Sequence, residues 1–441
     1  MNKNFLNSIL SLAVLGFLFM SCSQEKKTAF DEKSGVCIKK DGEKYTVYKN
    51  GEPFVIKGAS GFTNFKALKE AGGNTIRVWD TLHLKDILDS ASHYQIAVVV
   101  GLPMLSSEYI DDFYNDDLKT KRFEKDILTI TNKFKNHPSV LFWCLGNELV
   151  FPNRPKYNKF YETFNKIVSL IHVNDPNHPV TTTLLSVQKK NIFNITFRTE
   201  VDFLSFNIFG ALKTFSTDIK SIDWFWKGPF LITEWGIEGP WTTDSQNAWG
   251  AYIEGTSTKK AEQYLELYQK YMPDKDPRYL GSMVFYWGQK QELTPTWFSL
   301  FDENGIKTEA VNVMQYIWTG KKARATAPLL NYMLLNGKGA KDNIFLKPGA
   351  VANGEVLLTQ SNQEALSYRW ELMKEDWHKP NGIFSEKKPG KLEGLIVENK
   401  GTRVKFKIPD QEGPYRLFVY IYNRSGYLAT ANTPFYVISN P

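Results

Sequence analysis

The chain has 441 residues, which is more than one ordinary hydrophobic core uses, and its length therefore predicts two domains. Its hydrophobic content of 42% and charged content of 23% are typical of a globular protein. The formal charge of +7 is spread along the chain without basic runs interleaved with aromatic residues, which argues against nucleic-acid binding.

Residues 1–22 have the features of a signal peptide. Lys3 is the only charge before an apolar run at residues 9–20, which is too short for a permanent membrane-spanning helix. The sequence Leu-Phe-Met-Ser-Cys then ends at Cys22 and resembles a bacterial lipobox, in which this cysteine becomes the lipidated first residue; a plain signal peptide is the alternative. We therefore expect a lipid anchor to the bacterial outer membrane or cell surface, or to its periplasmic face, followed by a polar tether at residues 23–40.

The next part of the chain alternates between strand and helix signals. Residues 45–53 predict a β-hairpin that turns at Asn50-Gly51. Eight strand signals follow at residues 54–57, 74–79, 96–101, 140–145, 180–185, 201–207, 230–233 and 281–287. Helical periodicity is found between or after them at residues 65–71, 82–91, 118–134, 157–172 and 310–318.

This pattern predicts an α/β fold, a (β/α)8 or TIM barrel at residues 41–320. An open, doubly wound sheet is the alternative, but no glycine-rich phosphate-binding turn follows the first strand.

The last part of the chain predicts a different architecture. Residues 321–328 are basic and small, as in a linker, and helical periodicity then disappears. Short alternating runs separated by turn residues predict an immunoglobulin-like β-sandwich at residues 329–441, with strands at residues 355–359, 367–372, 404–408, 415–422 and 435–438. A spacer or a wall packed on the barrel is the favoured role, and an independent sugar-binding module is the alternative.

Cysteine and histidine usage gives no metal signal. Besides Cys22, the chain has Cys37 and Cys144, and the latter lies in an apolar run that predicts a buried strand. The two thiols do not suggest a disulfide framework, and the six histidines show no ligand spacing. We expect neither a metal nor a cofactor.

Two of the predicted barrel strands end in a glutamate. The apolar run 140–145 stops at Gly146-Asn147-Glu148, and the run 229–233 stops at Glu234-Trp235-Gly236. The carboxyl ends of barrel strands meet at one face, so both side chains are expected there. Two such carboxylates are what a retaining glycosidase uses, one as proton donor and one as nucleophile, whereas helix capping is the structural alternative.

The motifs Asn-His-Pro-Ser-Val at 136–140, Gly-Asn-Glu at 146–148 and Thr-Glu-Trp-Gly at 233–236 together resemble the clan A glycoside hydrolases. The resemblance is to the catalytic barrel of glycoside hydrolase family 2 and to small endo-glucanase families such as family 158, and it covers roughly residues 40–320. It implies a double displacement with Glu148 as acid/base and Glu234 as nucleophile.

The resemblance also implies roles for residues at other strand ends. Arg77 matches the arginine beside the nucleophile, with a structural ion pair as the alternative, and Asn147 matches the asparagine that contacts the sugar 2-hydroxyl. Trp287 matches the tryptophan that forms the floor of the subsite for the cleaved sugar, with ordinary core packing as the alternative. Trp79 and Asn207 are further substrate-binding candidates, as is Trp235.

One position departs from the family pattern. Many relatives carry a tyrosine near the end of strand six that donates a hydrogen bond to the nucleophile, whereas this chain has Asn-Ile-Phe-Gly at 207–210. If Phe209 occupies that place, the hydrogen bond must come from elsewhere.

The resemblance implies a retaining hydrolase of β-linked polysaccharide. The sequence does not determine the oligomeric state, and we expect a monomer. We expect an endo-β-glucanase, with β-1,3-glucan as a candidate substrate. A β-mannanase, an exo-acting β-glycosidase or a transglycosylase of the same clan is the alternative within the enzymes. A non-catalytic surface glycan-binding lipoprotein is the alternative of another class, and the intact pair of glutamates argues against it.

Overall fold

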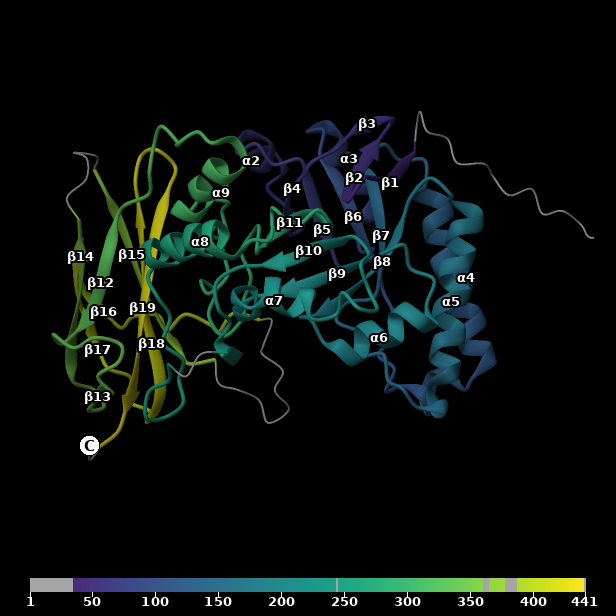
Figure 1. Cartoon of the computed structure of the whole chain (residues 1–441). Coiled ribbons are helices and arrows are strands. Elements are labelled where there is room, and N and C mark those ends of the chain that lie inside the picture. Colours follow the sequence, from purple (N-terminus) through teal and green to yellow (C-terminus); the bar gives the residue numbers. More distant parts are fainter. Residues whose placement is uncertain (1–34, 243–244, 360–364, 377–386, 440–441) are drawn as a thin grey trace, which may run out of the picture.

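The computed structural model describes residues 35–242, 245–359, 365–376 and 387–439. A barrel with surrounding helices lies beside a β-sandwich that follows it in the chain (Figure 1). The expected signal peptide, Cys22 and most of the expected tether lie outside the described residues. No helix within these ranges has both the length and the apolar character needed to cross a membrane.

A small antiparallel sheet precedes the barrel. It consists of β1 (Val36–Asp41), β2 (Lys44–Lys49) and β3 (Glu52–Pro53), and the predicted Asn50-Gly51 turn joins the last two. Val36 and Val47 are buried in a cluster with residues of the barrel strands. Residues 36–40 therefore belong to the folded domain and not to the expected tether, because burial of this apolar edge stabilises the first strand.

Eight parallel strands form a closed barrel, which confirms the predicted fold. The neighbours follow chain order, and the last strand pairs with the first to close the ring. The strands are β4 (Ile56–Ser60), β5 (Thr75–Val78), β6 (Ala97–Leu102), β7 (Val140–Leu145), β8 (Val180–Leu185), β9 (Phe203–Ile208), β10 (Phe230–Trp235) and β11 (Tyr279–Phe285). Nearly all their residues are buried because the barrel interior covers one face and helices cover the other.

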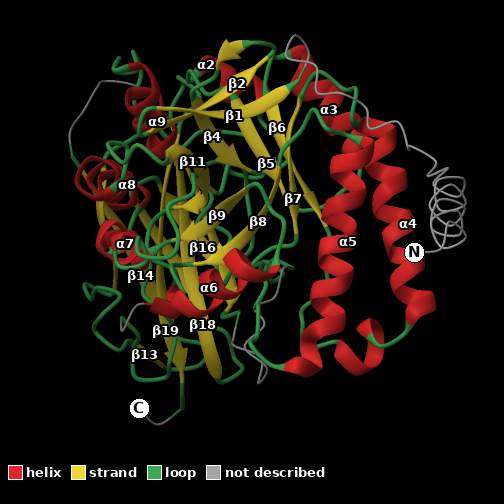
Figure 2. Ribbon diagram, turned by 45° about the vertical axis from the view of Figure 1, so that its right-hand side comes forward, coloured by secondary structure: helices red, strands yellow, loops and turns green. Residues whose placement is uncertain are grey.

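Helices surround the barrel, with α4 and α5 packed side by side (Figure 2). The described helices are α2 (Phe65–Glu70), α3 (Leu84–His93), α4 (Asp117–Phe134), α5 (Asn158–Asn174), α6 (Lys189–Arg198), α7 (Phe215–Lys220), α8 (Ser257–Tyr271) and α9 (Glu309–Thr319). The side chain of Asp116 caps α4 and that of Thr256 caps α8, each by accepting backbone N–H bonds. Helices α6, α7 and α8 were not predicted from the sequence.

Two four-stranded sheets form the C-terminal domain, which confirms the predicted β-sandwich. One sheet contains β12 (Leu330–Leu335), β14 (Val351–Leu358), β17 (Arg403–Lys407) and β16 (Ile396–Lys400). The other contains β13 (Phe345–Leu346), β19 (Leu428–Val437), β18 (Gly413–Tyr422) and β15 (Ser367–Lys374).

The second sheet is covered on both faces. On β18, Leu417 and Val419 lie in the sandwich core, whereas the alternate residues Phe418 and Tyr420 form a separate apolar cluster against Ile306 of the barrel domain. This explains why β18 is buried almost throughout instead of showing an exposed face. The sandwich is thus a wall packed on the barrel.

Candidate active site

A cavity of about 1000 Å³ lies at the carboxyl ends of the barrel strands. Asn147, Glu148 and Glu234 line it together with aromatic side chains. The barrel therefore brings the two predicted glutamates, which are 86 positions apart in the chain (234 − 148), into one cavity.

A sharp turn after β7 presents the first glutamate. Gly146 has a φ of +78° and Glu148 a φ of +54°, so the backbone leaves the strand in left-handed conformations. A Cβ at position 146 would lie 2.4 Å from a methyl carbon of Leu149, so this contact and the positive φ together favour glycine there. Backbone strain at a polar residue such as Glu148 is a common feature of functional sites.

The second glutamate is held inside the barrel mouth. Glu234 is only 5% exposed, and its Oε1 accepts hydrogen bonds from Nη1 of Arg77 and, at 2.7 Å, from Nε1 of Trp79. Arg77 is itself fully buried in β5. This carboxylate therefore has a positive counter-charge and a second donor, which suits a residue that must act as an anion.

A hydrogen-bond network joins the two carboxylates. Asn207 Nδ2 donates to Glu148 Oε1 at 2.8 Å and to Asn147 Oδ1 at 3.1 Å, and Arg77 Nη2 donates to the same Asn147 oxygen at 2.6 Å. The hydroxyl of Thr233 donates to Asn207 Oδ1 at 2.9 Å and fixes the orientation of that amide. Each of these side chains comes from a strand or strand end, so the geometry is set by rigid elements.

The two glutamates occupy different electrostatic environments. Partial burial raises the pKa of Glu148 above its usual value, and the negative charges of Glu234 and Glu292 raise it further. The hydrogen bond from Asn207 and the charge of Arg77 oppose this rise only in part. Glu148 therefore holds a proton more tightly than an ordinary carboxyl group, as a general acid must.

Trp79 donates a hydrogen bond to Glu234, the bond that a tyrosine near the end of strand six would otherwise supply. Phe209 lines the cavity without a hydroxyl group, and the indole of Trp79 donates to Glu234 instead. The indole ring is stacked on Tyr286, with centroids 5.8 Å apart, and Arg77 lies 5.0 Å from its centroid. Trp79 thus lies in the cavity as expected, beside the nucleophile candidate.

Trp287 does not lie in the cavity, and the prediction that it stacks on the sugar is wrong. It is fully buried, its ring packs on Phe301 and Trp318, and its indole N–H donates to the backbone oxygen of Asn64 at 3.2 Å. The reason is that β11 ends at Phe285, after which the chain turns and directs this side chain toward α9.

The prediction that Trp235 binds substrate is also wrong. It is 1% exposed and packs on Tyr264 and Tyr268 of α8. Because neighbouring residues of a strand point to opposite faces, Glu234 points into the barrel and Trp235 points to the helix layer.

Several lining residues were missed by the sequence analysis. They include the aromatic residues Phe62, Trp241, Phe285 and Tyr286 and the polar residues Asp80, Gln289, Lys290, Gln291, Glu292, Lys387 and Lys388. The position of Phe285 at the end of a barrel strand was a usable signal, whereas the loop and sandwich residues carry none. Within the described ranges, no group of three or more His, Cys, Asp or Glu side chains is arranged to hold a metal ion.

Comparisons with known proteins agree with the barrel. Residues 93–281 match the family described as glycosyl hydrolases family 2, TIM barrel domain. No curated protein sequence matches the chain.

Solved structures share its fold. A β-glucuronidase of Faecalibacterium prausnitzii is 18% identical with a TM-score of 0.50, over 65% of this chain and 52% of that one. A calcium-binding mutant of Bacteroides uniformis β-glucuronidase 2 is 13% identical with a TM-score of 0.50, over 91% and 48%. An endo-β-1,4-mannanase from Thermotoga petrophila is 15% identical with a TM-score of 0.42, over 89% and 99%. The chain spans about half the length of these two β-glucuronidases, at 52% and 48%, and residues 93–281 of its barrel domain are similar to the TIM barrel domain of family 2 glycosyl hydrolases.

Proposed function

We propose that the protein is a retaining glycoside hydrolase that cleaves β-linked polysaccharide by double displacement. The observation that carries this proposal is the pair of strand-end glutamates, joined by one hydrogen-bond network but placed in opposite electrostatic environments. One carboxyl group is favoured as a proton donor and the other is paired with a buried cation, which is the division of roles that this reaction needs.

In the first step Glu234 attacks the anomeric carbon while Glu148 gives its proton to the leaving oxygen. In the second step Glu148 takes a proton from water, and the resulting hydroxide displaces Glu234 from the sugar, so that the configuration is retained. Arg77 and Trp79 hold the attacking carboxylate in position through the bonds described above.

Asn147 is placed to bind the sugar being cleaved. Its side-chain oxygen accepts bonds from Arg77 and Asn207, which leaves the amide nitrogen of this exposed residue to donate to a sugar hydroxyl. A bond to the 2-hydroxyl would strengthen as charge develops on the ring in the transition state.

The size of the cavity favours a polymer. Its volume of about 1000 Å³ is at the upper end of the range for small-molecule sites and leaves room for more than one sugar ring. We therefore favour an endo-β-glucanase, with β-1,3-glucan as a candidate substrate. A β-mannanase or an exo-acting β-glycosidase is the alternative, and the fold shared with a β-glucuronidase supports the exo-acting one.

We also propose that the enzyme acts as a monomer at the bacterial outer membrane or cell surface, anchored by a lipid on Cys22. The proposal is supported by the apolar run at residues 9–20 and the lipobox-like sequence after it. Metabolic labelling with a fatty acid should mark the wild-type chain and not Cys22→Ala; equal labelling of both would contradict it.

The first experiment is product release from a panel of β-1,3-, mixed-linkage and β-1,4-glucans, mannan and aryl β-glycosides. We expect oligosaccharides from one glucan, with a loss of activity on the order of 10⁴-fold in Glu234→Ala. Proton NMR of the first product should show the β-anomer; an α-anomer would contradict retention. Binding to a member of the panel without any hydrolysis would instead favour the glycan-binding lipoprotein.

A further inference from the structure

The candidate active-site cavity has two kinds of lining. Aromatic rings, among them Trp79 and Tyr286, suit stacking on the apolar faces of sugars. Polar side chains suit binding of sugar hydroxyls, and they come from the loop after β11 and from the C-terminal sandwich, as Lys387 and Lys388. The sandwich thus contributes two side chains to the cavity that holds the catalytic candidates.

The segment that carries these lysines is attached to the sandwich. Lys388 Nζ lies 3.4 Å from Glu371 Oε2 of β15, and its side chain is 33% exposed. A few residues later, the backbone N–H of Leu392 donates to the carbonyl oxygen of Leu372 at 2.8 Å, and Lys391 forms a bridge with Met373. The lysines are therefore held at the cavity by pairing along β15.

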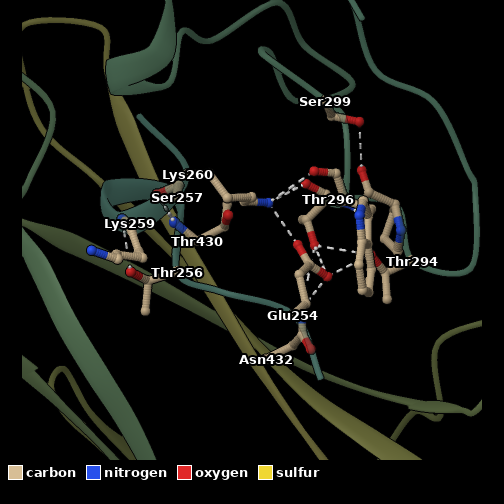
Figure 3. Close-up of polar contacts among 12 residues, drawn as sticks. Glu254, Thr256, Ser257, Lys259, Lys260, Thr294, Thr296, Ser299, Thr430 and Asn432 are labelled. Atoms are coloured by element: carbon tan, nitrogen blue, oxygen red, sulfur yellow. Dashed lines mark hydrogen bonds and ion pairs between the residues drawn. The ribbon is translucent and has the colours of Figure 1, made fainter. Parts of the chain in front are cut away.

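The loop after β11, which provides four polar lining residues from Gln289 to Glu292, is fixed to the sandwich by a buried carboxylate (Figure 3). Glu254 Oε2 accepts from the hydroxyls of Thr294 and Thr296, at 2.6 and 3.1 Å, and from Asn432 Nδ2 of β19, at 2.6 Å. Lys260 Nζ of α8 donates to its other oxygen at 2.6 Å. One side chain thus connects the loop, a barrel helix and the sandwich.

A second set of contacts reaches the cavity wall directly. Gln291 Nε2 in the loop donates to Asp376 Oδ2 of the sandwich at 2.8 Å. Next to it, Arg416 of β18 pairs with Glu375 at 2.6 Å and donates to the backbone oxygen of Tyr252 in the barrel domain at 2.8 Å. The two sources of polar lining, loop and sandwich, are therefore fixed relative to each other by buried contacts.

We propose that the sandwich completes a substrate subsite, in which Lys387 and Lys388 bind the hydroxyls of a sugar ring adjoining the ring held by the catalytic glutamates. This inference rests on the proposed function. The ring is neutral: Lys388 faces Glu371, and Lys290 in the same cavity pairs with Glu292 at 2.8 Å, so these charges already have counter-charges. The C-terminal domain is then a part of the active site and not a separate binding module.

The test compares Lys387→Ala/Lys388→Ala with Lys321→Ala/Lys322→Ala in the full chain. The second pair is exposed, adjacent in sequence and outside the cavity lining, and it removes the same charge. Loss of two hydrogen bonds should raise KM for the polysaccharide and its longer oligosaccharides about tenfold, with kcat unchanged. The aryl monoglycoside should be cleaved as by wild type, and the control should match wild type on every substrate.

The outcomes separate this inference from the proposed function. An equal rise in KM for both double variants would reduce the effect to net charge and overturn the subsite, as would an unchanged KM for long substrates. Wild type could prefer uronate-bearing oligosaccharides, and Lys387→Ala/Lys388→Ala could lose this preference. That result would overturn the claim that the sugar ring in the subsite is uncharged. If the wild type hydrolyses nothing, the proposed function fails, and calorimetry with the same oligosaccharides still tests the subsite through a weaker Kd in this variant. Equal thermal midpoints would show that both variants are folded.

Discussion

The active-site cavity contains a partly buried glutamate and the interface between the domains a fully buried one, and their pKa values shift in opposite directions. Burial alone would raise the pKa of Glu254 in the interface, but the charge of Lys260 and the surrounding donors bring it below its usual value. Burial also raises the pKa of Glu148 in the cavity, and there the donor Asn207 and the charge of Arg77 do not cancel the rise, to which Glu234 and Glu292 add. Burial raises the pKa of both acids, and the charged and hydrogen-bonding partners of each acid decide whether that rise is cancelled.

The same difference assigns the two glutamates different roles: Glu254 stabilises the fold, and Glu148 takes part in the proposed reaction. The interface carboxylate has its hydrogen-bonding capacity filled and connects two domains, whereas the cavity carboxylate is incompletely paired and faces space for a ligand. A group that is poorly compensated in the free protein can change its protonation state during a reaction at little cost.

The largest effect should follow from removing the cavity acid. Glu148→Gln keeps the shape of the side chain but has no proton to give, and kcat/KM on polysaccharide should fall about 10²–10⁴-fold. Steady-state kinetics on aryl glycosides with acidic leaving groups should show a much smaller loss in the first step, because such groups need little protonation. Glu43→Gln, an exposed position in the N-terminal sheet, is the control. Equal losses on both kinds of substrate would show that Glu148 is not the proton donor.

The interface glutamate should affect stability instead. Glu254→Gln leaves the ammonium group of Lys260 buried without its counter-charge, and the free energy of unfolding should fall by about 3–5 kcal/mol in denaturant titrations. Adding Lys260→Met removes the stranded charge and should recover most of the loss. A double variant no more stable than the single one would contradict this account of the pair.

Lowering the pH should reduce the difference in free energy of unfolding between wild type and Glu254→Gln. The folded-state pKa of Glu254 lies below its unfolded value, so its contribution is complete above about pH 4.5 and is lost as the pH falls through the folded-state pKa. The difference in free energy of unfolding between the two proteins should therefore be constant near neutral pH and shrink in acid. A difference that grows on acidification would reverse the sign of the assigned shift.

The smallest effect should follow from substituting Glu292, whose charge acts on Glu148. Activity requires protonated Glu148, so kcat/KM should decline as the pH rises through its pKa, and the charge of Glu292 is one cause that keeps this pKa raised. Glu292→Gln should move the alkaline limb of the pH profile to lower pH, while Glu43→Gln should leave it in place. A limb that does not move would mean that another group controls it.

Local sequence patterns were sufficient to find the barrel and both glutamates. The unbroken apolar runs before Glu148 and Glu234 reflect burial on both faces, and a glycine two positions from each acid directly follows the last residue of the strand. The alternation within a strand could also have excluded Trp235, which must point away from the side of Glu234. Phe209 was expected to leave the nucleophile without the hydrogen bond that a tyrosine supplies in many relatives, but the sequence did not indicate that Trp79 donates one instead.

By itself, the sequence determined the order of the barrel strands and five of the surrounding helices, the sandwich after the linker and the two strand-end acids, because these depend on periodicities within a few residues. Only the tertiary structure decided that Trp79, and not Trp287, lies beside the nucleophile candidate, since the turn after β11 sets the direction of the latter. It also decided which donors reach each acid: Arg77 and Glu234 are 157 positions apart, and Glu254 and Asn432 are 178 apart. Contacts over such separations follow from closure of the barrel and docking of the sandwich, for which no local pattern exists.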